Sequence, residues 1–329
     1  MPPDVTVLIA TYNRAKDLEK TLEGMARAER KGFSVEFVVI DNGSTDHTRS
    51  VAEAFRDRMP LRYIFEGRSG KNRALNTALE TCELGRLVAF TDDDIDAPPD
   101  WLTSMRSVCD RWPDHSVFGG RIYVVYPDKR VPEWARDYYV SSLALGQHAY
   151  SEKECVYQDE VTPFGGNLWV RREVFDNGRR YDEKVGPRQK NRMGGSETSF
   201  LDGLLRDGYG IVYSPFAVVG HRIQPEVLKF SVVCRRAYHW GRARPYIYGL
   251  PQQDLLEQHP AVWRLKQFVT LTRTSVKVAL VLLLSHWGKR LIRCAPRIEK
   301  IGYHVEAMRI ARERVARAVS AISTPGSLH

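Results

Sequence analysis

The chain has few cysteines for its length, and none of them belongs to a CxxC pair. Its 329 residues contain five cysteines, an odd number, scattered from Cys82 to Cys294. A secreted disulfide framework needs an even set, and a structural zinc site needs closely spaced thiolates. The spacing argues against both and predicts a protein of a reducing compartment, the cytoplasm.

Long uncharged apolar runs are also scarce. The run Val278–Trp287 has ten residues without Asp, Glu, Lys or Arg, and Arg273 and Lys277 interrupt the approach to it. A helix that crosses a bilayer needs roughly 20 apolar residues, so we expect no transmembrane helix. The segment Met1–Asp4 has no basic stretch typical of a signal peptide, and none is expected. No repeat or nucleic-acid-binding module is recognisable, so nucleic acid is not an expected partner.

Acidic residues are rare in the last third of the chain. Residues 222–329 contain 19 Lys and Arg but only 6 Asp and Glu, a balance of +13, whereas residues 1–221 have a balance of −4. A basic segment suits an anionic membrane, a nucleic acid or an acidic substrate, and we favour the membrane surface. Arg297–Ile322 has apolar residues at helical spacing and arginines on other faces, which is typical of an interfacial helix. Its apolar stripe could instead pack on the body of the protein.

Short apolar runs alternate with helix-period segments up to about residue 115. Strands are predicted at Val5–Ala10, Val35–Ile40, Leu61–Phe65 and Leu87–Phe90, and helices at Asp17–Glu29, Thr45–Arg56, Lys71–Glu83 and Trp101–Arg111. This alternation predicts an α/β fold whose sheet is mostly parallel. Beyond it we expect strands at Val117–Val125, Phe164–Val170 and 211–219, a helix at Glu197–Arg206, an irregular stretch at 126–162 and a flexible basic loop at Gly186–Gly195.

Three consecutive carboxylates, Asp92, Asp93 and Asp94, follow the apolar run Leu87–Phe90. Like charges at the end of a buried strand repel one another and lose solvation, so something must offset them. Hard oxygen ligands suit Mg²⁺ or Mn²⁺, which would also neutralise a diphosphate. A solvated acidic turn is the alternative.

Several segments, taken in order, resemble the family 2 glycosyltransferases over roughly residues 5–245. They are Val7–Arg14, Val38–Asp46, Gly70–Asn76, Phe90–Asp94, Pro163–Leu168 and Gly194–Thr198. The resemblance implies a GT-A fold, a Rossmann-like sandwich, and an inverting enzyme that moves a sugar from a UDP- or dTDP-sugar to a saccharide or lipid-linked acceptor. Its place would be in cell-surface polysaccharide or glycolipid assembly.

The motifs, together with the basic and helical character of the last third of the chain, suggest domain limits. Residues 1–225 would form the catalytic domain, with a nucleotide-binding half at 1–115 and an acceptor half at 116–225. Residues 226–329 would be a basic, amphipathic helical extension, attached peripherally to the inner face of the cell membrane.

By resemblance, the first two strand ends bind the nucleoside. Thr11, Tyr12 and Arg14 would line the pocket, and Asp41 would accept a hydrogen bond from the ring N–H of uracil or thymine. Tyr12 could equally belong to the core. Asp41–Ser44 is also good turn and helix-capping sequence in its own right.

The carboxylates divide into sugar and metal contacts in the same way. The resemblance implies that Asp92 or Asp93 contacts the ribose and that Asp94 binds Mn²⁺ or Mg²⁺. His221 follows a late apolar strand, where related enzymes supply a further metal ligand, although such a histidine can be structural.

A glycine-bounded basic segment precedes the third predicted helix. Gly67–Lys71 lacks the spacing of a phosphate-binding loop. It predicts a helix N-terminus near the nucleotide, with Arg68 or Lys71 as a charge partner.

The candidate general base is Glu197. The family usually shows an acidic pair at this point, whereas this chain has Ser196 before Glu197. Glu197 would deprotonate the acceptor hydroxyl for in-line attack. Asp202 is the reserve, and a simple first-turn helix acid is the alternative.

Two departures from processive relatives favour addition of a single sugar. At Arg236–Trp240, where those relatives have a Gln-x-x-Arg-Trp motif, Arg236 stands in place of Gln and His239 in place of Arg. The transmembrane helices of those relatives are also not expected here. A retaining or nucleotidyl transferase, or a non-catalytic nucleotide-sugar-binding protein, remain the alternative functions.

Overall fold

The computed structural model describes residues 1–128, 130–158, 161–188 and 193–323, and for Trp287, Gly288, Val315 and 317–323 it describes the backbone alone. The chain divides into two compact units, Met1–Leu228 and Lys229–His329. Residues 189–192 of the predicted 186–195 loop lie outside the described residues.

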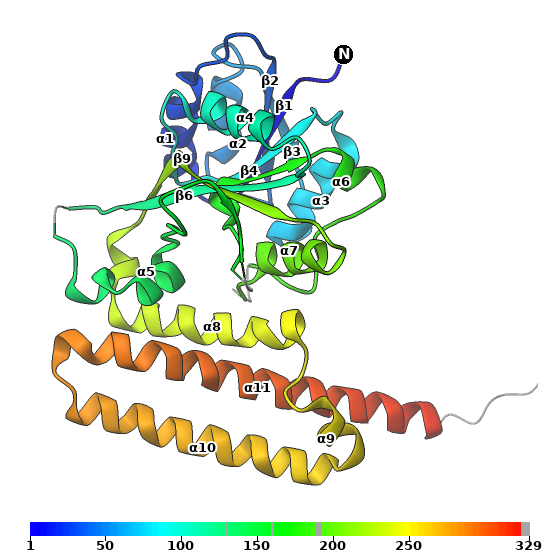
Figure 1. The fold of residues 1–329 in the computed structure, drawn as a ribbon, viewed down its shortest axis with the longest axis vertical. Coiled ribbons are helices and arrows are strands. Elements are labelled where there is room, and N and C mark those ends of the chain that lie inside the picture. The colour runs from blue at the N-terminus through cyan, green and yellow to red at the C-terminus, as the bar shows by residue number, and fades with distance from the viewer. Residues whose placement is uncertain (129, 159–160, 189–192, 324–329) are drawn as a thin grey trace, which may run out of the picture. The chain divides into compact units, whose positions relative to one another are not determined.

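The first half of unit 1 is built from four parallel strands (Figure 1). They are β1 (Val5–Thr11), β2 (Val35–Asp41), β3 (Leu61–Phe65) and β4 (Leu87–Asp92). Helices connect them or follow them, namely α1 (Ala15–Ala26), α2 (Thr48–Ala54), α3 (Lys71–Thr81) and α4 (Trp101–Arg111). The predicted α/β alternation is confirmed here, with each predicted strand present.

Both faces of this sheet are buried, which explains why its strands read as continuous apolar runs. Val5, Val7 and Ile9 of β1 share one hydrophobic cluster with residues of α1, α2 and α4. Leu8 of the same strand belongs to the opposite cluster, with residues of α3 and α7. Alternate side chains of a strand point to opposite faces, so one short strand serves two apolar layers.

The second half of unit 1 makes the sheet mixed. Its strands are β5 (Ile95–Asp96), β6 (Val117–Val125), β7 (Cys155–Val156), β8 (Leu168–Arg171) and β9 (Ile211–Arg222). The sheet runs β3-β2-β1-β4-β8-β6-β9-β5, with β7 on β9. β8 is antiparallel to both β4 and β6, whereas β6 and β9 are parallel. The parallel character predicted for the sheet is therefore concentrated in its first half.

Further short helices complete unit 1, some in the stretch expected to be irregular and one at the helix predicted over Glu197–Arg206. They are η1 (Glu133–Arg136), α5 (Tyr138–Leu145), η2 (Gly165–Asn167), α6 (Glu173–Asp176), α7 (Ser196–Arg206) and η3 (Pro225–Leu228). The predicted strand Phe164–Val170 starts later, because η2 occupies its first part. Asn167 ends η2, and its buried side chain donates to the carbonyls of Arg121 and Ala217 and accepts from Trp101. One amide thus fastens this turn to β6, β9 and α4.

Unit 2 is helical, as predicted. It contains α8 (Phe230–Tyr248), α9 (Gln253–Gln258), α10 (Pro260–Leu284) and α11 (Trp287–Ser323). α8 and α11 pack closely because glycines lie at their contact: a Cβ at Gly241 would overlap the carbonyl of Glu299, and one at Gly302 would overlap that of Tyr238. The described part of the predicted interfacial helix, within α11, therefore packs against its own unit.

The prediction that no helix is long enough to span a membrane was wrong. Val278–Trp287 is only the end of an apolar segment, and α10 extends over 25 residues. Among the described residues α10 alone has the length and composition to cross a bilayer, although a soluble core helix passes the same test. The argument for single-sugar transfer that rested on the lack of such helices is correspondingly weaker.

Candidate active site

The carboxyl ends of β1, β2 and β4 meet at one edge of the sheet. Thr11 pairs in register with Asp41, and Ala10 with both Ile40 and Asp92. Parallel sheets bind ligands outside this edge, and the predicted site residues Thr11, Asp41 and Asp92 end the three strands there. The parallel ladder itself therefore gathers side chains that are 30 to 80 residues apart in sequence.

Four charged side chains form what we call the Arg14 cluster: Arg14, Asp93, Asp94 and His221. The Arg14 guanidinium lies 3.4 Å from Asp93 Oδ1 and 2.9 Å from Asp94 Oδ2. The Thr11 hydroxyl donates to Asp93 Oδ2 at 2.7 Å. Burial alone would lower the pKa of Arg14, but the two carboxylates raise it, so the cation is firmly held.

The pKa values of the two carboxyl groups in this cluster are shifted in opposite directions. Burial raises the pKa of Asp93 to about 7, although Arg14 opposes the shift. Burial would also raise the pKa of Asp94, but the facing His221 ring and Arg14 lower it below its ordinary value. Adjacent acids that are pushed apart in this way can carry one proton between them near neutral pH.

His221 reaches Asp94 because two short segments pair. Ile95 of β5 lies opposite His221 of β9, and the backbone N–H of Arg222 donates to the Asp94 carbonyl. His221 Nδ1 lies 2.6 Å from the carbonyl oxygen of Leu145, the last residue of α5. Nδ1 can donate to that carbonyl while Nε2 faces Asp94 Oδ2 at 3.3 Å. Burial would lower the pKa of His221, but Asp94 raises it, so the protonated ring pairs with the carboxylate.

Asp94 and His221 fit a divalent metal that is completed by a ligand. Asp94 Oδ1 is buried and has no hydrogen-bond partner within the described part of the chain, so it has an acceptor to spare. Those residues contain no set of three His, Cys, Asp or Glu side chains that would enclose an ion. Mg²⁺ and Mn²⁺ commonly take one or two protein ligands plus substrate phosphates, which is compatible with a pair.

A second group, the Lys71 cluster, contains Lys71, Asp92 and Glu197. Lys71 Nζ donates to Asp92 Oδ1 at 2.7 Å and to Glu197 Oε1 at 2.8 Å. Burial would lower the pKa of Lys71, but Asp92 and Glu197 raise it well above its ordinary value. The first predicted carboxylate and the candidate base thus share one ammonium group.

The start of α7 determines where Glu197 lies. Gly195 precedes the helix with φ +85°, a left-handed conformation that favours glycine. Ser196 contacts Asn72 of α3, whose amide also donates to the carbonyls of Asp182 and Val185. A Cβ at Gly165 would overlap the Glu197 carboxylate. Gly165 therefore leaves room for this side chain, and Gly195 permits the turn that starts its helix.

The reserve base points elsewhere. Asp202 forms an ion pair with Arg206 one turn further along α7, at 2.6 Å. Five residues correspond to about 500° of helical rotation, so Asp202 and Glu197 lie on different faces. Within the described structure only Glu197 of this pair joins the carboxylate cluster.

Arg68 is bound to a neighbour in its own loop. Its guanidinium makes two hydrogen bonds to the carboxylate of Glu66, at 2.9 and 2.7 Å, and Thr77 adds a third at 2.6 Å. These contacts lower the pKa of Glu66 to about 2, with Arg68 as the main cause. Of the two cations predicted near the nucleotide, the structure brings only Lys71 to the carboxylates.

Asp41, which is predicted to bind the nucleoside, already accepts hydrogen bonds from the protein. Asp41 accepts from the Ser44 backbone N–H and from the Tyr63 hydroxyl, both at 2.8 Å, so its turn-forming role is real. Each carboxylate oxygen has a second lone pair and can accept a further donor. Tyr12 follows β1 and is 36% exposed, so it is not a core residue.

Three residues that shape the site were not predicted from the sequence. Asn42 ties the 66–70 loop to β2, since its amide bonds the carbonyls of Glu66 and Arg68 and the N–H of Gly70. Arg222 donates to Ile95, Asp17 and Thr21 and so fixes β5 beside α1. Leu145 acts through a backbone carbonyl, for which no sequence signal exists.

Known proteins were compared with this chain. The family described as "Glycosyl transferase family 2" matches residues 6–179. Glycosyltransferase AglE of Haloferax volcanii is 24% identical over 81% of this chain and 82% of its own length. Succinoglycan biosynthesis protein ExoM of Rhizobium meliloti is 26% identical over 72% of this chain and 73% of its own.

Solved structures support the same fold. The mannosyltransferase PcManGT of Pyrobaculum calidifontis, in complex with GDP-Man and Mn²⁺, aligns with a TM-score of 0.55 at 18% identity, over 96% of this chain and 88% of its own. TarS 1–349 of S. aureus aligns with a TM-score of 0.51 at 13% identity, over 95% and 92%. The family match covers more than half of the chain, and the protein belongs to glycosyl transferase family 2, as an enzyme with the GT-A fold.

Proposed function

We propose that this enzyme transfers a sugar from a UDP- or dTDP-sugar to an acceptor hydroxyl with inversion, in the assembly of a cell-surface polysaccharide or glycolipid. The observation that carries the proposal is the Lys71 cluster. It joins Asp92, at the nucleotide edge of the sheet, to Glu197 on the acceptor side through one ammonium group. A base on one side of the reacting carbon and a diphosphate on the other suit in-line displacement.

The choice of a uracil or thymine nucleotide rests on Asp41. Its carboxylate ends β2 beside Thr11 and can accept the ring N–H that these bases offer. Tyr12 would stack on the base. Among the similar proteins, one TarS structure contains UDP and the PcManGT structure contains GDP-Man, so nucleotide sugars as a class are well supported and the base is the point to test.

Asp94 and His221 would hold Mn²⁺ or Mg²⁺ in this proposal. When bound, such an ion supplies Lewis-acid stabilisation of the leaving diphosphate. Arg14 holds Asp94 from one side while Leu145 orients His221 from the other, so both ligands are fixed before the substrate arrives. Asp92 or Asp93 would bind the ribose.

Glu197 would accept the proton of the acceptor hydroxyl through its carboxylate. Lys71 bonds to one oxygen of Glu197, which leaves the other for the substrate. Lys71 therefore orients the base. Two relatives suggest the kind of acceptor: one is named glucosyl-dolichyl phosphate glucuronosyltransferase and the other succinoglycan biosynthesis protein ExoM.

Calorimetric titration tests the donor. Purified protein is titrated with UDP, dTDP, GDP and ADP, each with Mn²⁺ and with EDTA. We expect metal-dependent binding of UDP or dTDP. Tighter binding of GDP would overturn the assignment to Asp41, and no nucleotide binding at all would overturn the transferase proposal.

Product stereochemistry tests the mechanism. NMR of the product formed from an α-linked donor should show a β-linkage, as single displacement requires. A retained α-linkage would exclude Glu197 as the base of a direct displacement.

A further inference from the structure

Helix α10 has one covered side and, roughly opposite to it, one exposed side that is apolar. Trp263, Gln267 and Thr274 are its buried residues, and they lie on one seam. The seam is anchored within unit 2, since Trp263 Nε1 donates to the Pro251 carbonyl and Gln267 lies 2.6 Å from His304 of α11. This seam is the side by which α10 belongs to its own unit.

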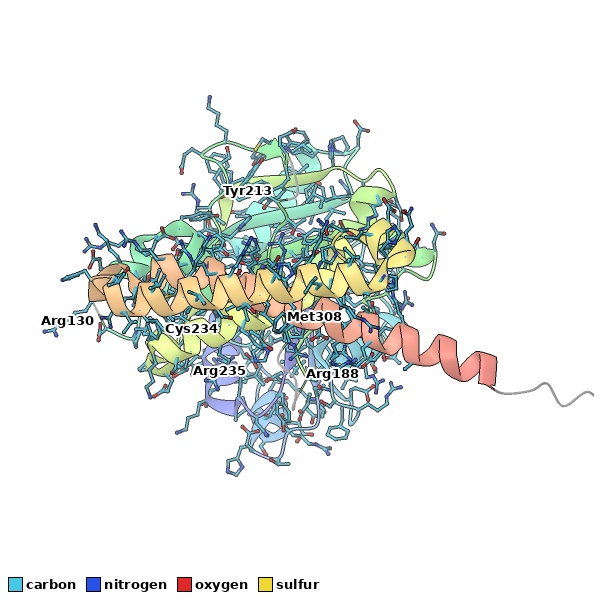
Figure 2. All side chains as sticks on the ribbon, turned by 90° about the horizontal axis from the view of Figure 1, so that it is seen from below. Arg130, Arg188, Tyr213, Cys234, Arg235 and Met308 are labelled. Atoms are coloured by element: carbon cyan, nitrogen blue, oxygen red, sulfur yellow. The ribbon has the colours of Figure 1, made fainter. Side chains whose placement is uncertain are left out.

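The second side is an exposed apolar stripe. Its residues, which we call the α10 stripe, are 36% to 76% exposed and consist of Val262, Leu265, Val269, Val276, Leu280 and Leu283. Their spacings of three, four and seven residues place them within about 60° around the helix, roughly opposite the buried seam. Phe268, at 60% exposed, widens the stripe. Figure 2 shows α10 across the front of the view, with no other helix of unit 2 over it.

Basic residues border the stripe on one flank. Lys266, Arg273 and Lys277 are exposed and lie within about 60° of the stripe's edge. Arg264 adds a fourth positive charge, and Pro260–Leu284 contains no Asp or Glu. An apolar stripe bordered by cations is the pattern of a helix that lies in a membrane interface.

We infer that α10 docks on an anionic lipid bilayer, parallel to its surface, with the stripe in the acyl boundary and Lys266, Arg273 and Lys277 among the headgroups. The charges argue against a second copy of the chain, because a symmetric contact would bring like charges together. The charges also argue against a helix that crosses the bilayer, because Arg273 and Lys277 would then lie in its hydrocarbon core. The binding surface thus belongs to α10 and not, as the sequence suggested, to α11.

Vesicle sedimentation of the full chain tests the inference. Vesicles of phosphatidylcholine with phosphatidylglycerol are compared with phosphatidylcholine alone, at low and at high salt. We expect binding to the anionic vesicles only, weakened by salt. The triple variant Lys266→Gln, Arg273→Gln, Lys277→Gln should lower the partition coefficient about a hundredfold, because each cation near such a surface contributes about a factor of five.

A second variant separates the apolar term from the charge. Leu265→Ser, Leu280→Ser and Leu283→Ser together should lower partitioning at least about tenfold while all charges remain. The matched controls change exposed residues of unit 1: Phe65→Ser with Phe216→Ser for the stripe, and Lys20→Gln, Lys31→Gln and Lys153→Gln for the cations. Both controls should bind vesicles like the original protein.

Several outcomes would overturn the inference. One is no binding to anionic vesicles at low salt, and another is equal binding by the stripe variant. Membrane-bound protein that alkaline carbonate does not extract would indicate a spanning helix. Concentration-dependent dimers that the stripe variant abolishes would make a second copy of the chain the partner of α10. Thermal unfolding and nucleotide binding of each variant verify that its fold is intact, and neither depends on vesicle binding.

Discussion

The Arg14 cluster and the Lys71 cluster lie at the same edge of the sheet but are built differently. Asp93 and Asp94 are 7% and 8% exposed, whereas Asp92 and Glu197 are 35% and 20% exposed. The Arg14 cluster is held by strand ends and by the β5–β9 pairing. The Lys71 cluster depends on the first turns of α3 and α7 and on one ammonium group.

This difference separates binding from turnover. A cluster fixed by a backbone ladder keeps its geometry without a ligand, which suits a site that must meet the concentrated charge of a diphosphate. A partly exposed ion pair between the first turns of two helices can exchange partners when an acceptor arrives. Substitutions in the Arg14 cluster should therefore change donor binding and stability, and those in the Lys71 cluster should change transfer alone.

Glu197→Gln should have the largest effect on the transfer rate and should leave the Arg14 cluster unchanged. The amide keeps the shape of the side chain and can still accept from Lys71, but it cannot take a proton. We expect the transfer rate to fall by about 10²–10⁴-fold, with nucleotide affinity and thermal stability unchanged. Steady-state kinetics and calorimetry measure both. Asp202→Asn is the control, and full activity in Glu197→Gln together with loss in Asp202→Asn would move the base to Asp202.

Asp94→Asn should show the opposite profile. Removing a candidate metal ligand should weaken Mn²⁺-dependent nucleotide binding by at least about 10–100-fold, while the weak binding in EDTA changes little. The midpoint of thermal unfolding should also fall, because Arg14 and His221 lose their shared countercharge. Asp110→Asn, a change at a 72% exposed carboxylate, is the control. Unchanged metal dependence in Asp94→Asn would remove Asp94 from the metal site.

The two clusters also differ in how far sequence could predict them. The residues that end parallel strands could be placed together, because buried strands give continuous apolar runs and their carboxyl ends converge. That reasoning reached the carboxylates Asp92, Asp93 and Asp94 without a structure, whereas Thr11 and Asp41 were assigned by the family resemblance. The apolar runs also predicted the strands β1–β4, each of which has a local signal in the sequence.

Long-range contacts could not be predicted in the same way. The strand β8 pairs antiparallel with β4 some 80 residues earlier, and α5 presents the Leu145 carbonyl to a histidine 76 residues later. Neither pairing has a local signal. For Arg68 a local partner decides its position, since Glu66, two residues before it, binds the guanidinium.

Lys71→Met should give an intermediate effect. The variant removes the ammonium that orients Glu197 but leaves the carboxylate, so kcat should fall about tenfold, as expected for the loss of one hydrogen bond to a charged group. KM for the donor should change less than kcat, because Lys71 acts on the base. Lys20→Met, on the exposed side of α1, serves as the control. A change confined to donor KM would show that Lys71 contacts the nucleotide instead.

Arg68→Gln should have the smallest effect and should be visible mainly as a change with pH. Arg68 lowers the pKa of Glu66 to about 2, below the ordinary value of 4.5. A carboxyl group with a depressed folded-state pKa stabilises the fold fully above its unfolded pKa, and this contribution is lost as the pH falls from about 4.5 toward 2. Arg68 is 65% exposed, so solvent screens the pair and its contribution to stability is small. Thermal unfolding from pH 6 down to pH 3 should therefore fall less steeply in Arg68→Gln than in the original protein, while nucleotide affinity at neutral pH stays the same. A large loss of nucleotide affinity would instead return Arg68 to the donor site and would give the nucleotide a third cation beside Arg14 and Lys71.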